Sequence, residues 1–400
     1  MENQAHGSDN RRGDLAGGRP ILTYPMILLL ITSLGSLGSF FLLMPVVPMF
    51  TATAESGGLG SAGLCTGALM LGTVLTEFAV PGLLRRYGYR TVMAAGLVLL
   101  GAPALVLVAS SGLAWVLGVC LSRGAGLGII VVAGAALVAE LVPADRRGEG
   151  LGLYGVVSAV PGIACLPSGL WLAENVGYGP VFVTGAAMAL LALLAVPGLP
   201  ARPAQTEQQG RVLAAFRTRG LASPAVTFAT VTVAAGILLT FLPLAVPDGS
   251  AEVAAFALLV QSGATALARW GAGRYGDRHG SARLLVPALL AAAAGTFTLI
   301  WVDSPVAVVA GMCLFGAGFG AAQNVTLSLM FERARRSDFG SVSALWNLAY
   351  DGGMGVGAVG FGLVAGAVGY SAGFLLTAVL LFAGLLPARL GRRTAPVAAC

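Results

Sequence analysis

Asp351 and Asn347 stand one helical turn apart in ALWNLAYDGG, residues 344–353, inside an otherwise apolar segment. A charge at the centre of a bilayer costs about 2.5–3.5 kcal/mol even on the gentler insertion scales. A carboxylate in such a place can bind a proton and become neutral, and an amide on the same helical face can hydrogen-bond it. We therefore expect Asp351 to take up and release a proton, with Asn347 beside it.

Other polar side chains interrupt apolar segments and are candidates for the same site. Gln323 and Asn324 lie near the middle of one segment. Adjacent helical residues point about 100° apart, so at most one of the two faces the site squarely, and Asn324 is favoured. Glu77 and Arg269 lie about two turns from the ends of their segments. They could be buried partners of other groups, gate elements or snorkelling side chains, and a structural role is favoured.

The elements that hold these side chains are long apolar helices. Of the 400 residues, 57% are hydrophobic and 10% are charged, whereas soluble domains carry about 25% charged residues. Apolar runs of about 20 residues, long enough to cross a hydrocarbon core about 30 Å thick, recur along the chain. The sequence predicts an all-α membrane protein with twelve transmembrane helices near 22–49, 60–84, 91–110, 113–141, 149–174, 178–199, 224–246, 252–274, 282–302, 305–330, 340–366 and 369–388.

The arginines predict how these helices are oriented. The chain has no lysine, and 21 of its 23 arginines lie in the two tails or in alternate loops, with Arg123 and Arg269 inside spans. Because arginine-rich loops stay on the cytoplasmic side, we expect a multi-pass protein of the plasma or inner membrane with both termini in the cytoplasm. Asp351 then lies eleven residues, about 16 Å, beyond the start of its helix near Gly340.

Several classes of function lack their characteristic residues in this sequence. The five cysteines and two histidines show no metal-ligand spacing, and there is no Walker-type loop. GAGLG at 124–128 and GAGFG at 316–320 follow no strand, so close helix packing explains them better than nucleotide binding. The spread of the basic residues over the loops argues against a nucleic-acid partner. We expect no enzyme, no catalytic or metal site and no cofactor.

The two halves of the chain match each other at a constant spacing of 192 residues. The matches are Gly88 with Gly280, GAGLG with GAGFG, Glu140 with Glu332, and Gly148 with Gly340. Parallel repeats of this kind are typical of transporters built from two six-helix halves around a central site. The predicted organisation is a cytoplasmic tail (1–20), an N-terminal half (21–199), a cytoplasmic linker (200–222), a C-terminal half (223–388) and a second cytoplasmic tail (389–400).

Two loops between predicted helices carry related motifs, GRYGDRHG at residues 273–280 and PGLLRRYG at residues 81–88. These motifs resemble the major facilitator superfamily, in which the loop between helices 2 and 3 reads Gly-x-x-x-Asp-Arg-x-Gly, with a weaker copy between helices 8 and 9. GRYGDRHG, residues 273–280, has Asp277, Arg278 and Gly280 in these places. PGLLRRYG, residues 81–88, keeps Arg86 and Gly88 but has Arg85 where the family has Asp. The resemblance covers nearly the whole chain and implies two pseudo-symmetric six-helix halves.

Two helices of the first half add to this resemblance. Arg123, Gly126 and Gly128 resemble the family's Arg-x-x-Gly-x-Gly pattern of helix 4. The resemblance implies that Arg123 faces the central cavity and contacts an anionic group or influences a proton site, with a structural role as the alternative. The stretch VVSAVPGIACLPSG loosely resembles the antiporter signature of helix 5, with Pro161, Gly162, Pro167 and Gly169.

The 192-residue spacing relates Arg85 to Asp277 and Arg146 to Asp338. In the resembling family, the 2–3 loop lies beside the start of helix 11 and the 8–9 loop beside the start of helix 5. We therefore expect Arg85 to meet Asp338 and Asp277 to meet Arg146, as a latch on the cytoplasmic face. Each partly exposed pair is worth only about 0–1 kcal/mol. The alternative is that these charges only anchor the cytoplasmic face.

The expected function is secondary active transport by a monomer in the lipid bilayer. The resemblance is greatest to the drug-efflux branch of the family, which implies proton-driven export of a small hydrophobic or weakly charged compound, such as a drug or natural product, by alternating access. A sugar-phosphate site would need several basic residues, and only Arg123 is well placed. The alternatives are a proton-coupled importer of a small metabolite, and a transporter-like sensor or scaffold without transport.

Overall fold

The computed structural model describes residues 22–54, 58–142, 146–201, 220–247, 250–334 and 339–385, which form helices and connections without a strand. The α-helices are α1 (Tyr24–Leu43), α2 (Val46–Ala52), α3 (Leu59–Val106), α4 (Leu113–Leu141), α5 (Arg147–Asn175), α6 (Tyr178–Leu191), α8 (Ala222–Ala245), α9 (Ala251–His279), α10 (Leu285–Thr298), α11 (Pro305–Glu332) and α12 (Phe339–Ala383). Three short 3-10 helices, η1 (Ala192–Gly198), η2 (Ser281–Leu284) and η3 (Leu299–Trp301), extend α6 and flank α10.

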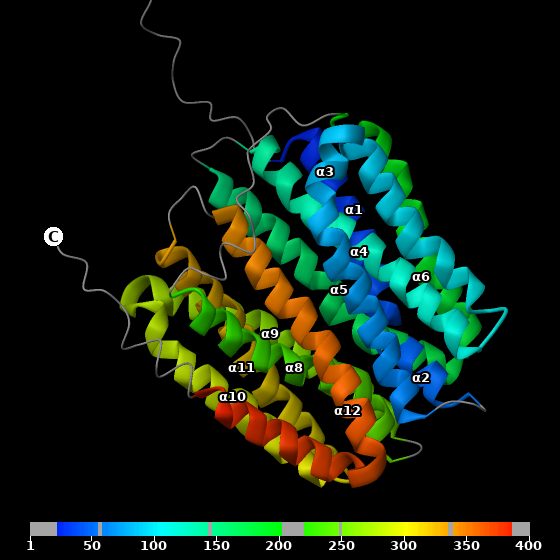
Figure 1. Cartoon of the computed structure of the whole chain (residues 1–400), viewed down its shortest axis with the longest axis vertical. Coiled ribbons are helices and arrows are strands. Elements are labelled where there is room, and N and C mark those ends of the chain that lie inside the picture. Colours follow the sequence, from blue (N-terminus) through cyan, green and yellow to red (C-terminus); the bar gives the residue numbers. More distant parts are fainter. Residues whose placement is uncertain are drawn as a thin grey trace, which may run out of the picture.

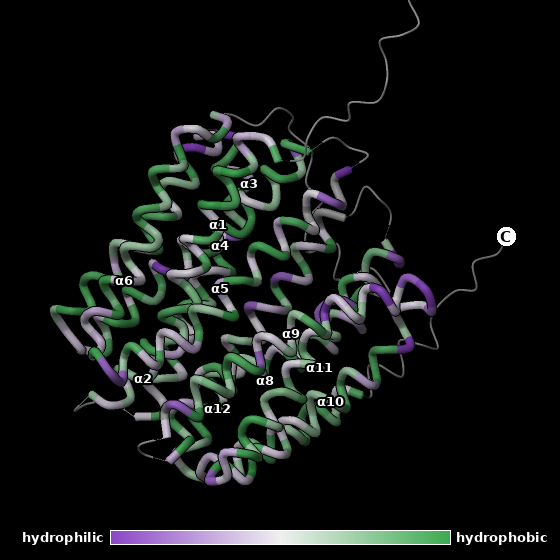
Figure 2. The backbone as a smooth tube through the Cα atoms, turned by 180° about the vertical axis from the view of Figure 1, so that it is seen from behind, coloured by the Kyte–Doolittle hydropathy of each residue, from purple (hydrophilic) through white to green (hydrophobic). Residues whose placement is uncertain are grey.

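The described residues contain ten helical segments long and apolar enough to cross a membrane. Two of them make two crossings each, because α3 bends at Gly88 (φ 76°) and α12 bends at Gly369 (φ 79°). A positive φ is accessible to glycine and costly for residues with a Cβ atom. The ten segments therefore make twelve crossings, which confirms the predicted all-α membrane fold. Figure 2 shows hydrophobic residues along the crossings and hydrophilic residues concentrated toward their ends.

Equivalent threonines tie equivalent helices together in the two halves. Thr73 of α3 donates a hydrogen bond to the Gly124 carbonyl of α4 (3.1 Å), and Thr265 of α9 donates one to the Gly316 carbonyl of α11 (3.1 Å). The two threonines are 192 residues apart, as are the two glycines. The sequence repeat is therefore a repeat of contacts as well as of residues.

The same relation holds at the helix ends that carry the arginine-rich loops. Tyr89 donates a hydrogen bond to the Glu140 carboxylate (2.9 Å), and Ser281 donates one to the Glu332 carboxylate (3.3 Å). In each half this bond joins the residue after a positive-φ glycine to the end of the α4 or α11 helix. The glutamates that match in the sequence thus accept equivalent hydrogen bonds in both halves.

Glycines of the GAGLG and GAGFG stretches lie where two helices nearly touch. A Cβ atom on Gly126 would stand 2.5 Å from the Gly96 carbonyl oxygen and 2.6 Å from the Leu100 nitrogen. A Cβ atom on Gly318, its counterpart, would stand 2.5 Å from the Ala288 carbonyl oxygen. These stretches therefore serve close helix packing, as small residues do in membrane proteins.

The two halves contact each other along α3 and the first crossing of α12. Gly67 packs against Val359, and a Cβ atom on Gly355 would stand 3.0 Å from Cβ of Met70. Thr66 of α3 and Thr240 of α8 share a buried hydrogen bond (2.9 Å). These contacts lie toward the Arg-poor end of the bundle, which we define as the end that carries the arginine-free loops.

The helices of the two halves are inclined to one another. In Figure 1 they converge at the lower right, near α2 and the far end of the first α12 crossing, and splay toward the top and the left. The splayed ends carry the arginine-rich loops and are called the Arg-rich end below. The halves are therefore packed together at one end of the bundle and spread apart at the other.

Candidate functional site

Asp351 lies in the first crossing of α12, twelve residues after its start at Phe339 and eighteen before the bend at Gly369. Twelve residues of helix span about 18 Å, which places Asp351 close to the middle of a bilayer. Its side chain is buried, with 9% of the residue exposed. The glycines that follow pack α12 tightly, with Gly353 against Thr232 and Gly357 against Val233 of α8.

An aromatic cluster adjoins Asp351. The rings of Trp346 and Phe228 stack with centroids 4.5 Å apart, and Tyr350 lies 5.7 Å from Trp346 and 6.1 Å from Phe319. Trp346 also donates a hydrogen bond to the Thr326 hydroxyl (3.2 Å). The cluster joins α8, α11 and α12. Trp346 and Tyr350 are only partly buried, so the C-terminal half presents an aromatic surface beside the carboxylate.

Glu77 of α3 is the partner of Asp351 from the other half of the molecule. The two carboxyl groups lie within hydrogen-bonding reach of each other. The Glu77 Oε1 atom is buried and has no hydrogen-bond partner. Two carboxylates this close cannot both be ionised at low cost, so the contact requires a proton between them. The site therefore spans both halves.

Arg269 of α9 brings a positive charge to the same region. It donates a hydrogen bond to the Gln323 side-chain oxygen (3.2 Å), and its guanidinium lies near the neutral Tyr350 hydroxyl. Gln323 is 5% exposed. The Asn324 amide turns toward α9, where a Cβ atom on Gly273 would stand 3.2 Å away. Arg269, Gln323 and Tyr350 thus form a polar chain that leads to Asp351.

Asn347 is half-buried and lies one turn before Asp351 on α12, on the same helical face. The sequence proposed this pair, and the structure keeps both side chains at that spacing. A hydrogen bond between Asn347 and Asp351 stays a prediction.

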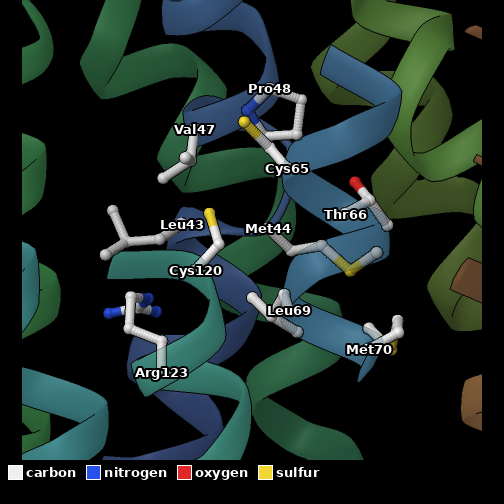
Figure 3. Close-up of a pocket in the computed structure, with 10 residues that line it drawn as sticks. All are labelled: Leu43, Met44, Val47, Pro48, Cys65, Thr66, Leu69, Met70, Cys120 and Arg123. Carbon is white, nitrogen blue, oxygen red and sulfur yellow. The ribbon is translucent and has the colours of Figure 1, made fainter. Parts of the chain in front are cut away.

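Arg123 lies in the interior of the N-terminal half. Its guanidinium donates to the Leu100 carbonyl of α3 (2.8 Å) and the Ser39 carbonyl of α1 (3.1 Å), and the residue is 1% exposed. Backbone carbonyls of two neighbouring helices thus hold its charge in this conformation, and a contact of Arg123 with an anionic group or a proton site stays a prediction. Arg123 lines a small pocket between α1, α2, α3 and α4, where Figure 3 also places Cys65 and Cys120.

The predicted latch residues lie at the Arg-rich end. Arg85 and Arg86 are exposed at the end of the first α3 crossing, as are Asp277, Arg278 and Gly280 at the end of α9. Arg146 forms an ion pair with Glu149 of its own helix (2.9 Å), and Asp338 lies outside the described residues. The pairings of Arg85 with Asp338 and of Asp277 with Arg146 stay predictions.

The prolines and glycines of helix 5 lie inside α5. Pro161 and Pro167 are within the helix, Gly169 packs against the Leu42 carbonyl, and a Cβ atom on Gly162 would stand 3.5 Å from the Phe41 ring. These glycines bring α5 close to α1 within the N-terminal half. Their relation to antiport stays a prediction.

Glu77 is the site residue whose partner the sequence did not identify. The expected contact between Arg85 and the start of helix 11 could have been used to predict this partner. Following both helices into the membrane from that contact brings Glu77 opposite the turn that holds Asn347 and Asp351. Phe228 and Phe319 of the aromatic cluster had no comparable signal, because they stand in helices that are apolar all around.

The sequence matches the Major Facilitator Superfamily profile over residues 29–358 and 225–399. None of the curated proteins matches the chain. Among solved structures, the nucleoside transporter NupG superimposes with a TM-score of 0.76 at 12% identity, over 90% of this chain and 99% of its own. The inward-facing bacterial homologue of the human lysosomal transporter Spinster has a TM-score of 0.75 at 15% identity, over 94% and 98%. The inward-open xylose transporter XylE of E. coli has a TM-score of 0.72 at 17% identity, over 94% and 97%.

Proposed function

The chain belongs to the major facilitator superfamily, and we propose that it is a proton-driven exporter of a small hydrophobic or weakly charged organic compound. As a member of that family it is a multi-pass membrane transporter and not an enzyme. The observation that carries the finer proposal is the buried Asp351 at mid-span, beside an aromatic surface.

The position of Asp351 supports proton coupling. Intramembrane carboxylates are costly and mark ion or substrate pathways when they are kept. Binding a proton removes the charge and lowers the cost of moving the carboxylate through a closed, water-free state. The coupling sites of such transporters lie near the midplane between the two halves, where Asp351 and Glu77 meet.

The surroundings of Asp351 support an apolar solute with an aromatic or planar part. The partly exposed rings of Trp346 and Tyr350 offer faces and edges on which such solutes stack at low conformational cost, and the buried Phe228 ring supports Trp346 from behind. Arg269 and Gln323 add one cation and one amide at the edge of this surface. A phosphorylated sugar would need several basic groups, and its recognition is not supported by this set.

The splayed Arg-rich end supports entry from the cytoplasm. Under the positive-inside rule this end and both termini face the cytoplasm of a cell-membrane protein. A solute would reach the aromatic surface from that side and leave after the halves rock to close it. We propose that a single chain carries out this cycle, because the site lies between the two halves of one molecule.

The test is transport into inside-out vesicles with an imposed pH gradient, over a panel of hydrophobic dyes and toxic compounds. We expect accumulation inside the vesicles that collapses with the gradient. Accumulation only in right-side-out cells would identify an importer of a small metabolite, and no flux of any compound would favour a sensor or scaffold.

Asp351→Asn should leave a folded protein whose accumulation falls to the level measured without a gradient, because the amide cannot release a proton. Asp303→Asn is the matched control, since Asp303 is exposed at the Arg-poor end, and it should transport like the wild type. Unchanged proton-driven transport by Asp351→Asn would contradict the assignment.

A further inference from the structure

We propose that Glu77 is a second coupling residue, and that Glu77 and Asp351 form one proton-binding site that joins the two halves. The proposal rests on proton-driven transport as its setting and adds that the proton is shared between α3 and α12. Asp351 alone would bind a proton within the C-terminal half. In the pair, the bound proton bridges a residue of the N-terminal half and a residue of the C-terminal half.

The register of the two helices supports the pairing. Gly63 of α3 packs against Ala358 of α12, and Met70 against Gly355, so the helices run in opposite directions along this contact. Two turns further along α3, the same register brings Glu77 opposite the turn from Asn347 to Asp351. The contact between Glu77 and Asp351 thus lies along the same helix pair, which the glycines bring close together.

The chemistry of the pair requires one proton. A protonated carboxyl donates its O–H to the other carboxylate, and the pair then carries a single negative charge. When the proton leaves to water, both groups are ionised and repel each other. No other bond forms or breaks in this step, and its only product besides the dianion is the proton.

The charged and titratable groups near the pair are few among the described residues. The neutral Tyr350 hydroxyl lies near Asp351, and the Arg269 guanidinium of α9 lies near Tyr350. Arg123 and Glu140 of α4, which packs on α3, bind the Leu100 carbonyl and Tyr89 instead. A singly protonated pair and the Arg269 cation therefore balance, and loss of the proton leaves one uncompensated negative charge.

The two halves also contact each other through α5 and α9, and this second contact carries a different charge pattern. At the 192-residue spacing Arg269 corresponds to Glu77, and Ala159 of α5 corresponds to Asp351. Pro167, Ser168 and Trp171 of α5 line a groove with residues of α9 at this contact. The position equivalent to the aspartate is thus apolar on the α5 side, so the repeated scaffold does not require a carboxyl pair. The carboxyl pair between α3 and α12 is therefore kept for proton binding and not for packing.

The pair predicts that protonation favours the conformation described above. The experiment measures the distance between spin labels on Tyr87→Cys of α3 and Tyr275→Cys of α9, with the native cysteines replaced by alanine. Both tyrosines are exposed at the Arg-rich end, one in each half. In the wild-type background we expect acidic pH to populate the long, splayed distance and alkaline pH to deplete it.

The decisive variant is Glu77→Gln, whose amide donates to Asp351 at every pH as the protonated carboxyl does. We expect Glu77→Gln and Asp351→Asn each to abolish the pH response and to hold the splayed distance. Glu140→Gln is the matched control, because it changes a carboxylate within the N-terminal half, and it should keep the wild-type response. Gel filtration of each variant reports folding independently of the labels.

Two results would overturn the pair. If Glu77→Gln keeps the wild-type pH response while Asp351→Asn loses it, Asp351 acts alone and proton-driven export survives without the second residue. If both variants keep the response, the pair is not the site of protonation. Conversely, loss of the response in both variants supports the pair even if no compound in the panel is exported, in which case only the proposed function fails.

Discussion

Gly126→Ala should destabilise the protein, because it acts on helix packing and on Arg123 together. The new Cβ atom would stand 2.5 Å from the Gly96 carbonyl oxygen, whereas ordinary contacts begin at 3.4 Å, so α4 must move by about 0.9 Å. Arg123, one turn earlier, donates to the Leu100 carbonyl of the opposing segment at 2.8 Å. The same displacement would stretch that bond beyond hydrogen-bonding distance.

The expected loss of stability follows from these two effects. Overpacking costs about 1–3 kcal/mol, and losing a hydrogen bond from a buried charge costs about 1.5–3 kcal/mol. Alanine returns about 1 kcal/mol through its higher helix propensity. The net destabilisation is roughly 1.5–5 kcal/mol, which for a chain of 400 residues corresponds to a fall in melting temperature of about 2–6 °C.

The melting temperature can be followed with a thiol-reactive fluorophore in detergent. Cys65 and Cys120 are 1% and 2% exposed, so they react only when the N-terminal half opens. Gly118→Ala in the same helix is the matched control, because a Cβ atom there meets nothing within 4 Å. If Gly126→Ala melts at the same temperature as Gly118→Ala, the link between the glycine contact and Arg123 is refuted.

Three further predictions follow from the repeat and from the contacts between the halves. Gly318→Ala should cost only the packing part, about 1–3 kcal/mol, because no arginine stands at the equivalent place in the C-terminal half, and the same melting assay measures it. Thr66→Val should deprive Thr240 of its partner and weaken the seal of the Arg-poor end by about 1–2 kcal/mol, seen as faster labelling of a cysteine placed there. Arg85→Asp should impair transport, and adding Asp338→Arg should restore it; a well-expressed double variant without recovery would disprove the latch.

The number and kind of helices could be predicted from the sequence because hydropathy and length set them directly. Each apolar run must satisfy its own backbone hydrogen bonds in lipid, so it becomes a helix. The repeat was also readable, since equivalent residues such as Glu140 and Glu332 still make equivalent bonds. The bend at Gly88 falls between two predicted spans, the bend at Gly369 falls at the first residue of the last predicted span, and both replace loops.

The directions of side chains could not be predicted in the same way. A membrane helix is apolar on its lipid face and on its packed face, so hydropathy does not fix its rotation. Arg123 illustrates this, because its side chain points to backbone carbonyls inside its own half. Glu77 illustrates the complementary case, since the partner of a lone buried acid depends on which helix of the other half lies against it.

The depth of Asp351 has an electrical consequence. It lies about 18 Å into a hydrocarbon layer about 30 Å thick, so a proton that reaches it from one surface crosses roughly half of the transmembrane field. Half of the field at 100 mV is worth about 1.2 kcal/mol per charge. Occupancy of the carboxyl pair should therefore respond to membrane voltage, and a change of 100 mV should act on it like a shift of a little under one pH unit.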